Sequence, residues 1–138
     1  MISTLREFLD SNILVYAFTT DPRAAVAQGL LEHGGIISVQ GLNEFTKVAR
    51  RKLSMTWPEV RASLAAIRTL CGTILPIDIE THADALRIAE YYRYSIFDAL
   101  IIASALRANC STLWSEDMQD GIVIDGRLRI ANPFHPTC

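Results

Sequence analysis

One stretch near the start of the chain decides the fold: Glu7-Phe8-Leu9-Asp10-Ser11-Asn12-Ile13-Leu14-Val15-Tyr16. A short apolar strand ends there, and an apolar helix follows at once, with Ile13 and Leu14 on one face. Asp10 stands between the two, so we expect its carboxylate at the mouth of a sheet. One carboxylate is too few to hold a catalytic magnesium ion, so a metal site here requires acids from elsewhere in the chain.

Length and composition favour one domain. The chain has 138 residues and half of them are apolar, so we expect a single domain over residues 1–138 with a substantial core. No apolar run reaches the roughly 18 residues that a membrane span needs. Residues 1–6 lack the pattern of a secretory signal, and three widely spaced cysteines suit a reducing compartment, so we expect a cytoplasmic protein. A net charge of -2 gives no general attraction to nucleic acid.

Strand and helix patterns alternate along the chain. We expect strands at residues 5–9, 36–39, 73–77 and 111–115, and a hairpin over residues 122–130 that turns at Asp125-Gly126. We expect helices at residues 12–18, 21–33, 40–53, 56–70, 78–92 and 98–106. The last of these is apolar almost all round and should be buried. This alternation predicts an α/β fold with a mostly parallel sheet.

Acidic residues recur where the predicted strands end. In such folds function sits beyond the carboxyl ends of the strands. Asp10 follows the first strand, Glu44 lies on the helix after the second, and Asp117 follows the fourth. Asp98 heads the buried helix, and it can join the others only if that helix starts at the same rim. Each acid alone is more often a cap, a turn or a surface residue; Asp98 is the least ordinary, because charges are seldom buried unpaired.

A gathering of carboxylates needs a compensating charge. Two carboxylates 5 Å apart repel by roughly 3 kcal/mol at an effective dielectric constant near 20. Mg²⁺ and Mn²⁺ offset such repulsion, because they take oxygen ligands and keep several waters. They also acidify bound water and stabilise leaving oxygens, which is the chemistry of phosphodiester hydrolysis. The sequence has no glycine-rich phosphate loop that would indicate another kind of phosphate chemistry.

Four motifs stand in order along nearly the whole chain: Phe8-Leu9-Asp10-Ser11-Asn12-Ile13-Leu14-Val15-Tyr16, Leu42-Asn43-Glu44-Phe45, Ser95-Ile96-Phe97-Asp98-Ala99-Leu100-Ile101-Ile102-Ala103 and Leu113-Trp114-Ser115-Glu116-Asp117-Met118. The ending Ile130-Ala131-Asn132-Pro133-Phe134 accompanies them. In this order and at these separations the chain resembles the PIN-domain ribonucleases, and among them the VapC-type toxins of bacterial toxin–antitoxin pairs. Each motif alone is weak, whereas the four together are a strong match.

The resemblance implies a three-layer α/β/α fold with a central, mostly parallel sheet. It implies that the four acids discussed above form a catalytic site for Mg²⁺ or Mn²⁺, that Ser115 supports this site and that Asn12 holds the loop of the first acid. Glu116 and Asp120 compete with Asp117 for the fourth place. The resemblance also implies an endoribonuclease that acts on structured RNA such as tRNA or ribosomal RNA, forms a homodimer and is silenced by a VapB-like antitoxin.

A basic run follows Glu44 on the same predicted helix and includes Lys47, Arg50, Arg51 and Lys52. Such a run is usually a solvated helix face. Given the resemblance, we predict that some of Lys47, Arg50 and Arg51 border the acidic pocket and hold the RNA phosphates that flank the cut.

Two other functions stay open at this stage. One is a flavodoxin-like phosphoacceptor signalling domain, which is also α/β and also has an acidic metal pocket. Asp78 could supply its acid after the third strand, but the lysines, Lys47 and Lys52, come too early for its basic partner. The other is a PIN-like module that binds RNA or a partner without catalysis; the complete set of four acids argues against it.

Overall fold

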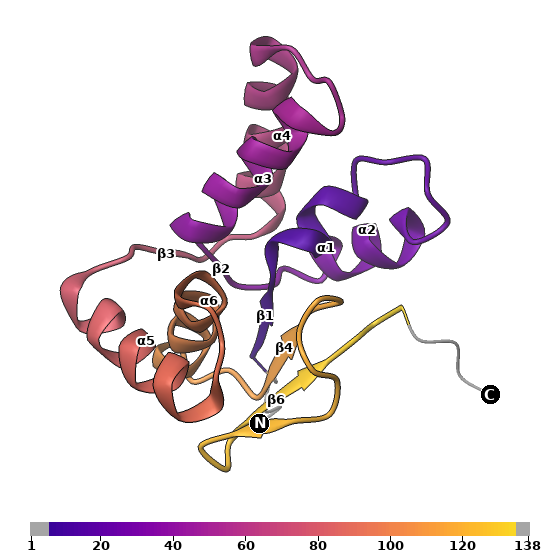
Figure 1. The fold of residues 1–138 in the computed structure, drawn as a ribbon. Coiled ribbons are helices and arrows are strands. Elements are labelled where there is room, and N and C mark those ends of the chain that lie inside the picture. The colour runs from indigo at the N-terminus through magenta and orange to yellow at the C-terminus, as the bar shows by residue number, and fades with distance from the viewer. Residues whose placement is uncertain (1–5, 135–138) are drawn as a thin grey trace.

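The computed structural model describes residues 6–134, so Leu5 of the first predicted strand, the start of the chain and Cys138 lie outside the described residues. Figure 1 shows the sheet between α5 and α6 on one side and α1 and α2 on the other, which confirms the three-layer α/β/α fold. The elements are β1 (Glu7–Leu9), α1 (Ser11–Tyr16), α2 (Ala24–Glu32), β2 (Ile37–Ser38), α3 (Val39–Arg51), α4 (Trp57–Leu70), β3 (Ile74–Leu75), α5 (Ile79–Tyr92), α6 (Ile96–Arg107), β4 (Thr112–Trp114), β5 (Val123–Ile124) and β6 (Leu128–Ala131).

The strands pair as β1-β4-β6-β5, with β5 alone antiparallel, and β2 pairs with β3 in parallel. A parallel bridge between Phe8 and Ile36 links the two groups, with the Leu9 amide donating to the Ile36 carbonyl at 2.9 Å. The carboxyl ends of β1, β2 and β4 therefore face one rim. The predicted hairpin is confirmed by the antiparallel pairing of β5 with β6, and Asp125 and Gly126, both with positive φ, form the turn that the bond from the Arg127 amide to the Ile124 carbonyl closes.

Successive residues of the central strands point into opposite layers, because side chains alternate along a strand. Phe8 and Leu113 pack with α5 and α6, whereas their neighbours Leu9 and Trp114 pack with α1 to α4. Both faces of the sheet are thus covered, which explains why apolar residues follow one another in these strands, as in Phe8-Leu9 and Leu113-Trp114, instead of alternating with polar ones.

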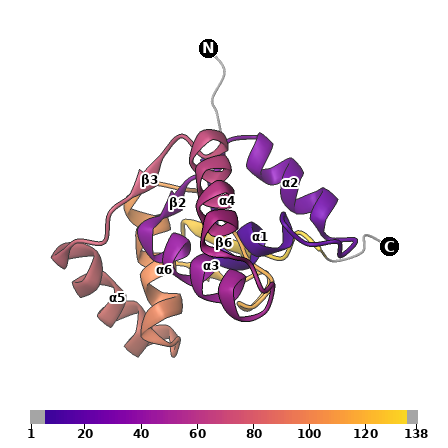
Figure 2. The same cartoon turned by 90° about the horizontal axis from the view of Figure 1, so that it is seen from above.

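The helices lie close to the ranges predicted from the sequence. Residues 99–106 of α6 are all buried, as the predicted all-round apolar helix requires. One prediction was wrong: α2 begins at Ala24 rather than at Asp21, because the Asp21 carboxylate and carbonyl accept from the amides of Arg23 and Ala24 and form a turn instead. Seen from above, α3 lies between α6 and α1 and contacts both (Figure 2).

Gly35 is required by the packing of β1. A Cβ atom at Gly35 would lie 2.7 Å from Cγ of Leu9, whose side chain is 1% exposed and cannot move aside. We expect Gly35→Ala to lower the free energy of unfolding by about 2 kcal/mol, measured by urea denaturation. Gly29→Ala is the matched control, because Gly29 lies inside α2 with nothing within 4 Å of the added atom, and it should raise stability by roughly 0.5–1 kcal/mol. Equal urea midpoints for Gly35→Ala and the unchanged protein would contradict the packing argument.

Candidate active site

Asp10 lies at the junction that the sequence indicated. Its amide donates to the Trp114 carbonyl and so continues the pairing with β4, while its side chain caps α1 by accepting from the Ser11 amide at 2.7 Å. The Ser115 hydroxyl donates to the other carboxylate oxygen at 2.8 Å. The side chain is thus fixed at the carboxyl end of β1 by bonds from both sides.

Burial makes Asp10 electrostatically unusual. The residue is 3% exposed, and this burial raises the pKa of its carboxyl group from 3.8 to about 7. The bonds from Ser115 and Ser11 lower this pKa, whereas the charges of Glu44 and Asp98 raise it further. The pocket therefore disfavours the ionised form of Asp10 unless a cation compensates the negative charge.

Glu44 and Asp98 reach the same pocket from two different helices. Glu44 lies in the second turn of α3 and accepts from the Gln40 amide group at 3.3 Å. Asp98 lies in the first turn of α6, whose cap is Ser95, and this helix does start at the rim where β1 ends. Burial, followed by the charges of Glu44 and Asp117, raises the pKa of Asp98 above its ordinary value. The acids therefore lie close enough to repel one another.

Asp117 is the acid of the last loop that faces the pocket. Its carboxylate accepts from Asn12 at 3.2 Å. Glu116 turns the other way: it accepts from the Tyr16 hydroxyl at 2.7 Å and forms an ion pair with Arg23. The Asp120 carboxylate accepts from the amide of Asn132 and does not line the pocket. Of these three neighbouring acids, Asp117 is the one that lines the pocket.

Asn12 and Ser115 tie the acids together. The Asn12 side-chain amide lies 3.4 Å from Asp10 and 3.2 Å from Asp117, and its oxygen accepts from the Glu116 amide. The Ser115 hydroxyl accepts from the Met118 amide, which leaves its proton for Asp10. Loop conformation and acid position are thus set by the same two side chains.

Basic side chains from α3 form the opposite wall of the pocket. Lys47 and Arg51 line it, and so does Lys52, which was not among the predicted binding residues although it belongs to the basic run. Arg50 lies elsewhere: it donates to the Met55 carbonyl at 2.8 Å and stacks over the ring of Trp57. Helical spacing explains the division, because Lys47 and Arg51 are four residues apart on one face and Arg50 points away from it.

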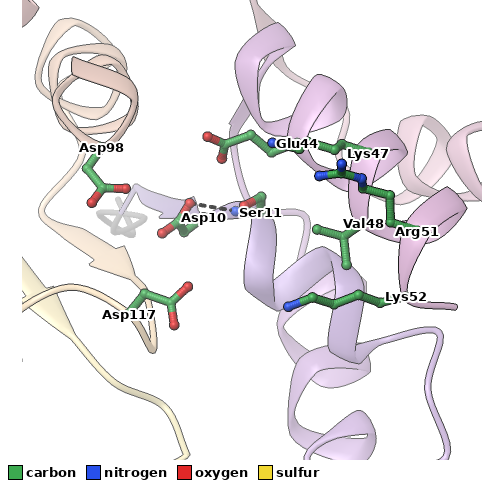
Figure 3. A pocket seen from close by; sticks show the side chains of 9 residues that line it. All are labelled: Asp10, Ser11, Glu44, Lys47, Val48, Arg51, Lys52, Asp98 and Asp117. Carbon is green, nitrogen blue, oxygen red and sulfur yellow. Dashed lines mark hydrogen bonds between the residues drawn. The ribbon is translucent and has the colours of Figure 1, made fainter. Parts of the chain in front are cut away.

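Figure 3 shows the result. Asp98, Asp10 and Asp117 lie on one side, and Glu44 extends toward them from α3; Lys47 and Arg51 lie beside Glu44, and the Lys52 side chain extends toward Asp117. The cavity has a volume of about 390 Å³. Acids from four separate segments therefore share one cavity with basic groups at its border. Gln40 and Lys52 are the lining or supporting residues that sequence reasoning missed; the i, i+4 spacing of Gln40 and Glu44 was a usable signal.

A sequence model of the PIN domain matches residues 8–119. The chain belongs to the PIN domain family. The matched region includes all four acids, Asn12, Ser115 and the basic run. Among curated proteins no match is found.

Two solved structures resemble this PIN domain over most of their length. One is VapC20 of Mycobacterium tuberculosis, described as a toxin that cleaves the sarcin–ricin loop; it is 17% identical, with a TM-score of 0.64, and the match covers 80% of this chain and 89% of that one. The other is a toxin–antitoxin complex from Klebsiella pneumoniae, 20% identical with a TM-score of 0.68, covering 95% of this chain and 99% of that one. At these identities the likeness establishes the fold.

The donor set of this PIN domain fits a hard divalent cation. All the acids offer carboxylate oxygens, and the buried Asp10 accepts hydrogen bonds from Ser11, Asn12 and Ser115, which are all uncharged donors. Within residues 6–134, no three Asp, Glu, His or Cys side chains are close enough together to hold an ion as they stand. A cation at this site would thus use fewer direct carboxylate ligands, with water completing its shell, as Mg²⁺ commonly does.

Asp78, the acid that a phosphoacceptor domain would use, caps α5 by accepting from Thr81 and lies outside the acidic pocket.

In residues 6–134, no helix combines the length and the apolar character needed to cross a membrane.

Proposed function

We propose that this PIN domain, comprising residues 1–138 as one domain, is an endoribonuclease that needs Mg²⁺ or Mn²⁺ and hydrolyses phosphodiester bonds in structured RNA such as tRNA or ribosomal RNA. The observation that carries the proposal is the shared pocket, in which Glu44, Asp98 and Asp117 come from separate segments and surround a buried Asp10 whose pKa is raised to about 7. A cluster of repelling carboxylates is electrostatically unfavourable in the folded protein, and such clusters are typical of functional sites. Cation-assisted hydrolysis of a phosphodiester bond is a function that these acids can serve.

The residues divide into three groups by their place in the pocket. Asp10, Asp98, Glu44 and Asp117 are the catalytic acids and hold the metal, some of them directly and the others through its bound water. Asn12 and Ser115 fix the position and hydrogen bonding of these acids, and Lys47 and Arg51 stand where they can hold the phosphates of the substrate. When bound, Mg²⁺ or Mn²⁺ would acidify the attacking water and offset the charge that develops on the phosphate.

The direct test is to incubate the purified chain with total cellular RNA. EDTA should abolish cleavage, and Mg²⁺ or Mn²⁺ added in excess should restore it. RNA that remains intact with every metal, while the chain still binds it, would favour the non-catalytic module.

Replacing both Lys47 and Arg51 with alanine should weaken RNA binding without removing the acids. If each side chain neutralises one phosphate of a single strand, the slope of log K against log salt should fall by roughly 1.4. The matched control is Arg61→Ala with Arg68→Ala, because both residues are exposed on α4. Fluorescence anisotropy with a labelled RNA between 50 and about 200 mM salt measures the slope. An unchanged slope in the Lys47 and Arg51 variant would remove these residues from the RNA site.

We further propose that the chain acts in the cytoplasm as the toxin of a VapBC-like pair, is a homodimer and is inhibited by a VapB-like antitoxin. The likeness to VapC20 and to a toxin–antitoxin complex supports this role. Expression of the intact chain should arrest bacterial growth, and expression of the Asp10→Asn variant should not. Size-exclusion chromatography with light scattering tests the dimer.

A further inference from the structure

A second cavity of about 300 Å³ adjoins the acidic pocket. The two share Ser11, Val48, Lys52 and Asp117 as a common border. Figure 3 shows Val48 and Lys52 at this border, with the Lys52 amino group on the side of Asp117. Anything bound in the second cavity therefore lies next to the acids.

The wall of the second cavity is mostly apolar. Val15 and Tyr16 line it from α1, and Val48 and Leu53 line it from α3 and the bend that follows. Each of these side chains is partly exposed, so the apolar surface is open to a ligand. Such a wall suits a flat ring better than a phosphate group.

Glu116 gives this cavity a hydrogen-bond acceptor. The Tyr16 hydroxyl donates to one oxygen of Glu116 at 2.7 Å. The other oxygen of Glu116 forms an ion pair with Arg23 at 3.6 Å. A carboxylate has about four acceptor positions, so Glu116 keeps room for further donors. Its side chain is 25% exposed, and the ion pair holds it in place. A carboxylate accepts hydrogen bonds but donates none, so it favours a base edge with an exocyclic amino group over the edge of uracil, where the single N–H group lies between two carbonyl oxygens that the carboxylate repels.

These features match the parts of a nucleotide. In RNA each phosphate is followed by a base, and proteins read unstacked bases through apolar contact and hydrogen bonds to their edges. Lys52, at the border, is placed to contact the intervening phosphate. We propose that the second cavity is a subsite for the base next to the cleaved bond, and that Glu116 makes it favour a base with an exocyclic amino group over uracil. The inference rests on the proposed ribonuclease function.

The experiment starts from the cut that the unchanged protein makes in total RNA with Mn²⁺, mapped by sequencing the fragment ends. Each nucleotide flanking that cut is then replaced in a synthetic substrate by each of the four bases, and cleavage rates are compared. At one flanking position, an amino-bearing base should be cleaved roughly tenfold faster than uracil, the discrimination that one hydrogen bond to a charged group provides. Glu116→Gln should reduce this ratio to below about threefold, because an amide both donates and accepts.

Leu53→Phe is the second variant, because Leu53 lines the second cavity and not the acidic pocket. Filling the cavity should also remove the preference at that position. Glu90→Gln, an exposed change on α5, is the control and should keep the tenfold ratio. A mere structural role of Glu116 would slow all four substrates equally and leave the ratio unchanged.

The outcomes separate the two proposals. Cleavage with equal rates for all four bases, or a preference that survives both Glu116→Gln and Leu53→Phe, overturns the base subsite and leaves the ribonuclease standing. Absence of metal-dependent cleavage by the unchanged protein overturns both.

Discussion

Asparagine in place of Asp98 is expected to lower the rate of RNA cleavage about a thousandfold, because a metal-assisted site supplies several kcal/mol of transition-state stabilisation. The change keeps the shape of the side chain, and it leaves the cap of α6 in place because the Ser95 hydroxyl oxygen accepts from the backbone amide of residue 98. It removes a charge that Glu44 and Asp117 repel. The variant should therefore fold as well as the unchanged protein, or better, while losing activity.

Cleavage of a labelled RNA with saturating Mn²⁺ and thermal denaturation with EDTA measure the two effects. The matched control is Asp84→Asn, which removes an acid that pairs with Arg107 on the surface of α5 and is expected to change neither quantity by much. An Asp98→Asn protein that keeps a tenth of the activity would exclude a direct role in the reaction. A large drop in melting temperature would show instead that Asp98 stabilises the fold.

The fold was predictable because its signals are local. Strand and helix periodicities alternate along the chain, and parallel strands joined by helices place their carboxyl ends at one rim. This reasoning sufficed for Asp10 and Asp117, which lie in the loops after β1 and β4, and for Glu44, which lies on the helix after β2. The position of Asp98 could not be predicted in this way. Asp98 lies in the first turn of α6, and it reaches the rim only because that helix begins there.

Other features of the site were not predictable because they depend on contacts between distant residues. Tyr16 and Glu116 are 100 positions apart, and nothing in either motif indicates that their hydrogen bond turns Glu116 away from the acids. Nothing in the sequence around Gly35 indicates that this residue must leave room for the Leu9 side chain. Arg50 and Arg51 are adjacent in a uniform basic run, and only the location of Trp57 explains why one of them stacks on a ring.

The raised pKa of Asp10 leads to the second large effect, on stability. The carboxyl group has a pKa of about 7 in the folded chain and 3.8 as its ordinary value, so the folded state binds this proton more tightly than the unfolded state does. Stability without metal must therefore fall as pH rises from about 4 to 7, and stay low above that range. Between pH 5 and 8 the loss from this one group should be roughly 3 kcal/mol. The Asp10→Asn variant has no proton to lose at this position, so it should not show this loss of stability.

Urea denaturation in EDTA at pH 5, 6, 7 and 8 tests this linkage. The difference in free energy of unfolding between Asp10→Asn and the unchanged protein should grow with pH in favour of the variant, while Asp84→Asn should follow the unchanged protein. Taking the difference cancels the other titrating groups that the proteins share. Mn²⁺ should restore the stability of the unchanged protein at pH 8 more than at pH 5, because a cation competes with the proton for the carboxylate, and it should do little for Asp10→Asn. Parallel curves for the two proteins would mean that the buried carboxyl group is ionised at no cost, and the electrostatic case for a cation at this pocket would fail.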